Sequence, residues 1–110
     1  MFHPATDDIT VEGILYALSD PARVRMFATL ADTKDAKTCT ALAESIGQPV
    51  PKSTLSQHFK VLRESGLIRS MRQGVELRNV SRCDEIEKRF PGLLRSIVEA
   101  LKRQGKRARR

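Results

Sequence analysis

The interval between apolar residues changes once along the chain. As far as Ser65, apolar positions recur every three or four residues, which is the period of a helix with one buried face. The pattern predicts four helices here, at residues 9–18, 21–31, 39–46 and 54–65. Asp20 and Ser53 are suited to cap the second and fourth helices. Gly47 and Gly66 are suited to end the third and fourth, so the first half of the chain is expected to be mostly helical.

Beyond Gly66 the apolar residues alternate at intervals near two, which is typical of strands. Two such runs flank Arg72-Gln73-Gly74, and the glycine is suited to the positive-φ position of a hairpin turn. The apolar members of the two runs are Leu67, Ile68, Met71, Val75, Leu77 and Val80. A helical turn is expected after Cys83 and a last helix after Pro91-Gly92. The predicted fold class is mainly α with a small β-hairpin: a winged helix-turn-helix of about five helices and a two-stranded wing.

A chain of 110 residues fits one small domain. Residues 1–8 show no periodicity and are predicted to form a flexible arm. Residues 9–101 are expected to hold the winged helix-turn-helix and the dimerisation elements, and residues 102–110 a basic tail. A domain of this size buries only about two thirds of its unfolded surface, so pairing of two copies would add to a modest core.

Composition excludes several classes of protein. The longest apolar run, residues 14–18, is far shorter than the ~20 residues that a membrane helix needs. Asp7, Asp8 and Glu12 stand where a secretory leader would have its basic and apolar parts. Cys39 and Cys83 are too few for a scaffold of disulfides. A cytoplasmic protein without a membrane partner is therefore expected.

The net charge of +7 is unevenly distributed along the chain. Residues 1–50 carry a net charge of −3, residues 51–82 carry +5, and residues 83–101 carry −1. Residues 102–110 add six positive charges. Clustered basic charge on an otherwise acidic chain is the expected footprint of nucleic-acid binding, although a solvated surface and a solubilising tail would look alike.

The fourth predicted helix has two different sides. Its apolar side holds Leu55, Phe59 and Leu62, with His58 near the inner edge. Its polar side holds Thr54, Ser56, Gln57 and Lys60. The major groove admits one helix, and short polar side chains near its start can reach base edges. The fourth predicted helix, which would be the second helix of the helix-turn-helix, is therefore the predicted recognition helix.

The candidate contacts differ in chemistry. Gln57 can pair with adenine, whereas Lys52, Lys60 and Arg63 suit phosphates beside the groove. Arg69 and Arg72 suit a wing laid along the backbone or the minor groove. The full set of candidate DNA-binding residues is Lys52, Ser53, Thr54, Ser56, Gln57, His58, Lys60, Arg63, Arg69, Arg72 and Gln73. For His58 a structural or phosphate-contacting role is favoured over metal ligation.

Three runs of sequence, at residues 18–23, 53–68 and 89–94, carry a resemblance to a known family. The first two are similar to the opening signature and to the recognition helix with the first wing strand of the ArsR/SmtB family of small winged-helix repressors. The third is similar to a C-terminal stretch of one subgroup of such regulators. The resemblance implies a homodimer built by the first and last helices on an inverted-repeat operator, released by a metal ion or another small signal. The implied interface residues are Val11, Ile14, Leu15, Leu18, Leu94, Ile97, Val98 and Leu101. For the last four, packing within one chain is the alternative.

The chain departs from this family at two places. Thr38 and Thr40 stand where metal-sensing members have a Cys-x-Cys pair, and hydroxyls do not replace thiolates as ligands of soft metals. The last helix also has no histidine. The chain is therefore placed in a non-metal-sensing subgroup, with no metal and no cofactor expected. The turn at residues 48–52 is about two residues longer than usual and holds two prolines.

The signal that would release the DNA is not evident from the sequence. Cys39 and Cys83 are candidate thiol sensors, although a small buried hydrophobe and an inert exposed thiol are the simpler interpretations. An enzyme is not expected, because no nucleophile, base and orienting group occur at supportive spacing. A winged-helix module that acts through protein contacts remains the alternative to a repressor with an unknown small effector.

Overall fold

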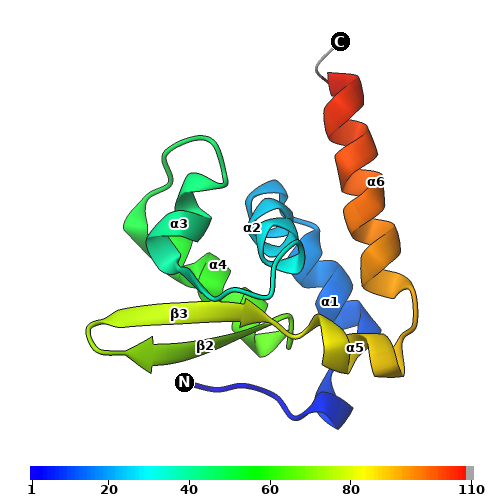
Figure 1. Cartoon of the computed structure of the whole chain (residues 1–110), viewed down its shortest axis with the longest axis horizontal. Coiled ribbons are helices and arrows are strands. Elements are labelled where there is room, and N and C mark those ends of the chain that lie inside the picture. Colours follow the sequence, from blue (N-terminus) through cyan, green and yellow to red (C-terminus); the bar gives the residue numbers. More distant parts are fainter. Residues whose placement is uncertain (109–110) are drawn as a thin grey trace.

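The computed structural model describes residues 1–108, which fold as a winged helix-turn-helix (Figure 1). A short 3-10 helix, η1 (Thr6–Asp8), precedes the regular elements. The helices are α1 (Val11–Leu18), α2 (Pro21–Ala31), α3 (Cys39–Glu44), α4 (Lys52–Glu64), α5 (Cys83–Arg89) and α6 (Leu93–Ala108). The strands are β1 (Lys37–Thr38), β2 (Ile68–Gln73) and β3 (Glu76–Ser81). The predicted fold is confirmed, with six α-helices and three strands in place of about five helices and two strands.

The ends of two helices test the predicted caps. Asp20 Oδ1 accepts hydrogen bonds from the backbone N–H groups of Ala22 (2.8 Å) and Arg23 (3.3 Å), as a helix cap does. The prediction for Ser53 is wrong, because α4 begins at Lys52, two residues before its predicted start, and Ser53 lies inside its first turn. Pro51 takes the capping position of α4 and offers no side-chain acceptor there.

The core surrounds α2. Met26, Phe27 and Leu30 of this helix are no more than 1% exposed. They pack with buried residues from other parts of the chain, namely Ile9, Ile14, Ala17, Leu18, Leu42, Ile46, Phe59, Leu62, Leu67, Ile68, Ile86, Leu94 and Val98. Since α4 contributes to this core with one side only, its other side is left to solvent. No helix within residues 1–108 is long and apolar enough to cross a membrane.

The wing is a three-stranded antiparallel sheet in the order β1-β3-β2. Its hairpin is in register from Ile68 opposite Ser81 to Gln73 opposite Glu76, and Gly74 takes the turn with φ +63° as predicted. The short strand β1 was not predicted. It is held in part by Asn79, which is fully buried and donates from Nδ2 to the Lys37 carbonyl at 3.1 Å.

Residues 3–9, here called the strap, are packed against the base of the wing, so the flexible arm predicted for residues 1–8 is wrong in this part. Pro4 is buried, and Arg82 Nη1 donates to its carbonyl oxygen at 2.8 Å. Ile9 is 2% exposed and covers Gly66, where the chain turns from α4 into β2. A Cβ on Gly66 would lie 2.4 Å from Ile9 Cγ1, and φ is +86° there, so this turn requires glycine.

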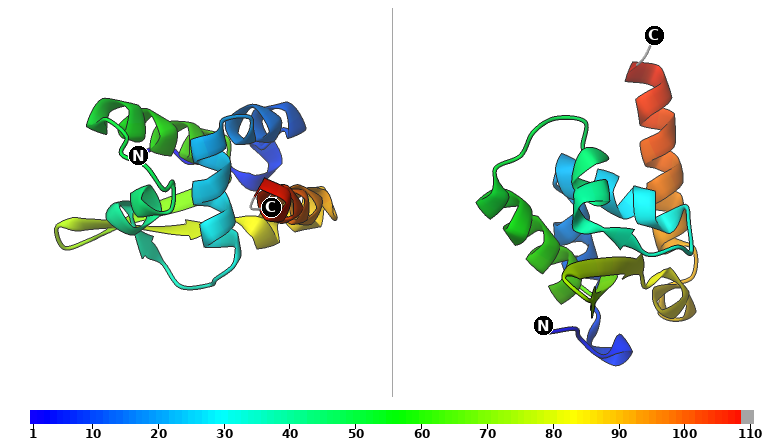
Figure 2. Two further views of the ribbon diagram at one scale, coloured as in Figure 1. Left: turned by 90° about the horizontal axis from the view of Figure 1, so that it is seen from above. Right: turned by 60° about the vertical axis from the view of Figure 1, so that its left-hand side comes forward.

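The last helix is longer than predicted. It continues through residues 102–108, which were expected to form a separate basic tail, and only residues 109–110 of that tail lie outside the described part of the chain. The C-terminal half of α6 projects beyond the other helices and the sheet (Figures 1 and 2). Residues 102–108 therefore continue the last helix.

Candidate nucleic-acid interface

Helix α4 presents one polar face to solvent. Lys52, Ser53, Thr54, Ser56, Gln57 and Lys60 are all exposed, and Arg63 is half-buried. On the opposite side, Phe59 and Leu62 are 5% and 0% exposed. The division of the helix into two sides thus agrees with the pattern in the sequence. A free polar face of this size can lie in a major groove, where its side chains would meet base edges and phosphates.

His58 does not belong to this exposed face. Its side chain is on the inner side of α4, the residue is only 8% exposed, and Nδ1 lies 3.3 Å from Arg23 Nη1. The Nε2 atom lies 3.9 Å from Asp20 Oδ1. The prediction of His58 as a DNA contact is therefore wrong, because burial and the contact with Arg23 keep its ring away from a duplex.

The wing places two of the predicted contacts at its outer end. Arg72 and Gln73 are exposed next to the turn, and Val75 at the tip is 95% exposed. The hairpin projects past the helices, with α3 and α4 on the same side of the molecule (Figure 1). A duplex along α4 would have the wing beside it, as expected for a winged helix.

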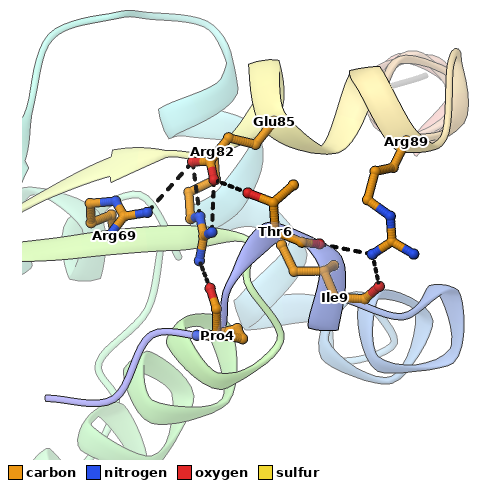
Figure 3. Close-up of polar contacts among 7 residues, drawn as sticks. All are labelled: Pro4, Thr6, Ile9, Arg69, Arg82, Glu85 and Arg89. Carbon is orange, nitrogen blue, oxygen red and sulfur yellow. Dashed lines mark hydrogen bonds and ion pairs between the residues drawn. The ribbon is translucent and has the colours of Figure 1, made fainter.

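Arg69, near the base of the wing, has a partner within the protein. Its Nη2 lies 3.6 Å from Oε2 of Glu85, and the side chains are 41% and 36% exposed. Glu85 also accepts from Arg82 Nη2 at 2.8 Å and from Thr6 Oγ1 at 2.6 Å (Figure 3). These hydrogen bonds, first from Arg82 and then from Thr6, lower the pKa of Glu85 to about 2. Glu85 is therefore ionised at neutral pH and offsets part of the charge that Arg69 could offer to a phosphate.

The strap ends at the free edge of the sheet. The backbone N–H of Ser70 in β2 donates to His3 Nε2 at 3.0 Å, which ties the start of the strap to this edge. Burial, followed by the positive charges of Arg69, Arg82 and Arg63, lowers the pKa of His3. On the other side of the strap, Arg89 Nη1 donates to the carbonyl oxygens of Thr6 (2.8 Å) and Ile9 (Figure 3). No local sequence signal indicated these contacts.

The residues predicted for a dimer interface divide into two groups. Ile14 and Leu18 of α1 and Leu94 and Val98 of α6 are no more than 8% exposed in the single chain, so they belong to its core. Val11, Ile97 and Leu101 are half-buried, and Leu15 is 51% exposed. Tyr16, which was not predicted, is 64% exposed beside Leu15.

A groove of about 380 Å³ connects the two helices of this surface. Leu18 and Val24 line one part of it, and Ile97 and Leu101 of α6 line another. The apolar surface available to a partner is therefore made by the exposed parts of α1 and α6 and this groove, and is narrower than the stripes in the sequence indicated.

Thr38, one of the two positions at which the resemblance implies a metal ligand, has a structural use here. Thr38 Oγ1 accepts from the Ala41 N–H at 3.1 Å and so caps α3. No group of three or more histidine, cysteine or acidic residues is arranged to hold a metal ion in the described part of the chain. The threonine hydroxyl is engaged in the first turn of α3, and its chemistry does not suit a soft metal.

Both cysteines are free and half-buried. Cys39 Sγ lies 3.5 Å from Asn79 Nδ2, the amide that also holds β1. Burial raises the pKa of the Cys83 thiol, and Asp84 and Glu87 act in the same direction. Since the thiolate is the reactive form, these surroundings make Cys83 less reactive than its place at a helix start indicated.

Comparison with known proteins agrees with this geometry. The sequence matches the family described as Helix-turn-helix domain over residues 18–70. It is 33% identical over 93 residues to the uncharacterized HTH-type transcriptional regulator YceK of Bacillus subtilis (strain 168), a match that covers 84% of this chain and 90% of the relative.

Two solved structures resemble the fold. The transcriptional repressor BigR from Xylella fastidiosa is 27% identical, with a TM-score of 0.61, over 83% of this chain and 81% of the other. The homodimeric winged helix-turn-helix DNA-binding domain Mb0332 from Mycobacterium bovis is 20% identical, with a TM-score of 0.62, over 84% and 82% of the two chains. The second likeness concerns the fold alone.

Proposed function

Because this chain belongs to the HTH-type transcriptional regulators and resembles the ArsR family in three runs of its sequence, we propose that it is a repressor that binds an inverted-repeat operator as a homodimer. The observation that carries the proposal is the polar face of α4, which is open to solvent beside a projecting wing. Likeness to a protein described as a transcriptional repressor supports the repressor role, and the apolar surface left exposed on α1 and α6 supports the dimer.

The proposed contacts with DNA follow from exposure and charge. Gln57, exposed in the second turn of α4, is the proposed base reader. Lys52, Lys60 and Arg63 are proposed to contact phosphates beside the groove, and Arg72 with Gln73 the backbone beneath the wing. Ser53, Thr54 and Ser56 can hydrogen-bond to bases or phosphates. His58 lies on the inner side of the helix and is not among the proposed contacts.

The proposed interface lies on the exposed parts of α1 and α6. Leu15 and Tyr16 offer large apolar surface on α1, and Ile97 with Leu101 offers it on α6. Pairing of two copies through this surface would bury apolar area that one small domain leaves in water. It would also give two recognition helices, as an inverted repeat requires.

A small molecule is the proposed signal for release, and its identity is not indicated. The capping role of Thr38 and the raised pKa of Cys83 favour neither a soft metal at α3 nor thiol chemistry at Cys83. Cys39, in contact with Asn79 at the base of the wing, remains the better candidate for thiol chemistry. The alternative function, a module for protein contacts, is disfavoured because the exposed face of α4 is polar and basic.

Selection of duplexes from a random library by the purified protein tests the proposal. The expected product is an inverted repeat that shifts as a complex of two chains per duplex in a mobility-shift assay. Failure to enrich any sequence would contradict specific DNA binding, and enrichment of a single half-site bound by one chain would contradict the dimer.

Light scattering of the free protein tests the interface separately. Leu15→Glu is expected to shift a dimer towards a monomer at micromolar concentration, because it buries a charge in the apolar contact. Val75→Glu is the matched control, since Val75 is also an exposed apolar residue but lies at the wing tip. A parent chain that is already monomeric would show the interface to be wrong.

A further inference from the structure

Arg23 is a buried arginine of α2 that holds the end of another helix. It is 7% exposed, and its Nε donates to the Ala17 carbonyl oxygen at 2.7 Å while Nη2 donates to that of Tyr16 at 3.2 Å. Both carbonyls belong to the last turn of α1, where the helix dipole is negative. The Tyr16 carbonyl also accepts from the Ser19 hydroxyl at 2.6 Å. A guanidinium at this place fixes α1 against α2.

The same guanidinium also reaches the recognition helix. Its Nη1 lies 3.3 Å from Nδ1 of His58, on the inner side of α4. A guanidinium only donates hydrogen bonds, so Nδ1 must accept and the ring proton must lie on Nε2. That proton faces Asp20, whose Oδ1 is 3.9 Å from Nε2. The contact therefore specifies one tautomer of His58 and one orientation of its ring.

The helices joined in this way carry the two proposed contact surfaces. Helix α1 bears Leu15 and Tyr16, and the Tyr16 ring lies against the Arg23 guanidinium, 5.3 Å from its centre. Helix α4 bears Gln57 on its outer side. Helix α2 packs between them and against both (Figure 2). A single buried side chain thus contacts the dimer-facing helix and the DNA-facing helix.

We propose that the Arg23–His58 contact is a positioning contact that sets α4 relative to α1, and thereby sets the spacing between half-sites that the dimer accepts. The proposal rests on the proposed function, because it needs a dimer on an inverted repeat. In such a dimer, the position of α4 relative to the shared α1 surface determines the separation of the two recognition helices. Apolar packing of Phe59 and Leu62 has no preferred direction, whereas the hydrogen bond between Arg23 and His58 does.

Spacer variants of the selected inverted repeat test the proposal. Adding or removing one base pair moves a half-site by about 3.4 Å along the duplex and turns it by about 35°. The parent is expected to lose about tenfold in affinity or more for either spacer variant, as for a mismatched site. His58→Leu is expected to lose less than about threefold, because α4 is no longer held in one position.

His58→Asn is the matched variant, since asparagine and leucine have the same shape and only asparagine can accept from Arg23 at this place. It is expected to keep the spacer preference of the parent. A His58→Leu chain with the full preference of the parent would overturn the proposal, and so would a His58→Asn chain with the weak preference of His58→Leu. A role in stability alone would change the unfolding midpoint of both variants without changing the preference.

Two further results keep the outcomes distinct. If the parent selects no inverted repeat, the proposed function fails before the spacing is tested. If His58→Leu does not unfold cooperatively, the proposal is tested instead by the tautomer of His58 in the parent. Long-range proton–nitrogen correlation of the ring measures that tautomer. An unprotonated Nδ1 is required, and a proton on Nδ1 would overturn the proposal.

Discussion

The recognition helix and the strap show two opposite uses of polar residues. The outer face of α4 is polar and open to solvent, and it leaves Gln57 and Lys60 exposed. Three polar groups of the strap are instead bonded within the protein: Thr6 to Glu85, the Pro4 carbonyl to Arg82, and His3 to Ser70. The difference teaches that a basic residue is a candidate for DNA only where the fold leaves its charge free.

The arginines near the wing make this difference concrete. Arg82 contributes to the basic count of residues 51–82, yet it is 3% exposed and bonded to Glu85 and Pro4. Arg72 contributes equally to that count and is exposed beside the turn. Net charge along the sequence therefore overstates the charge that a duplex would meet.

The largest expected effect is on stability, from Arg82→Met. The substitution removes the donor to the Pro4 carbonyl and leaves Glu85 without its main partner in a partly buried place. Loss of a buried charged partner of this kind is expected to cost about 2–3 kcal/mol of unfolding free energy. Denaturation by urea measures it.

Arg69→Met is the control for that measurement. Arg69 pairs with the same carboxylate, but its side chain is 41% exposed, so the cost is expected to stay below about 1 kcal/mol. Equal losses for Arg82→Met and Arg69→Met would show that the strap is not anchored by the buried arginine.

The next effect concerns affinity, from Gln57→Ala. Loss of a side chain that reads a base is expected to weaken binding by about 1–3 kcal/mol on the selected operator and by little on unrelated duplexes. Unfolding free energy should change by less than about 0.5 kcal/mol, because the side chain is exposed. Equal weakening on operator and unrelated DNA would assign Gln57 to the phosphates.

These two regions also mark what the sequence could predict. The recognition helix follows from an apolar period of three to four and from Gly66, both of which are local. The strap depends on partners 67 to 83 residues away, such as Ser70 and Arg89, and no local pattern indicates them. Strand β1 was missed for the same reason, since it has only two residues and forms by pairing with the distant strand β3.

The candidate site was also predicted only in part, because spacing along one helix does not show which of its residues another part of the chain covers. The polar face of α4 was found because exposure follows the helical period, whereas the fate of His58 at the edge of that face depended on Arg23 of another helix. The apolar stripes of α1 and α6 were also found, but a stripe has the same spacing whether it is covered by the chain itself or by a second copy. Burial of Ile14 and Leu94 therefore had to come from the structure.

A smaller effect is expected from single phosphate contacts. Lys60→Ala should lower the slope of log affinity against log salt by about one, on operator and unrelated duplexes alike. Arg69→Ala should lower it by less, because Glu85 at 3.6 Å already offsets part of the charge of Arg69. Titrations at several salt concentrations measure both slopes. A larger change for Arg69 than for Lys60 would reverse the distinction between free and internally paired charge.

The smallest effect is the dependence of stability on pH at His3. Its pKa is lowered in the folded protein, so as pH falls through 6.5 the unfolded chain takes up the proton first and the folded state loses stability. The loss levels off below the folded pKa, where the ring is protonated in both states and no longer accepts from the Ser70 N–H. His3→Gln keeps an acceptor near the Nε2 position but does not titrate, so its unfolding free energy should vary less between pH 7.5 and about 5. Both chains are best compared with His58→Asn added, because the sequence holds two histidines and this substitution removes the other one. Identical pH profiles would show that His3 does not hold the strap to the edge strand.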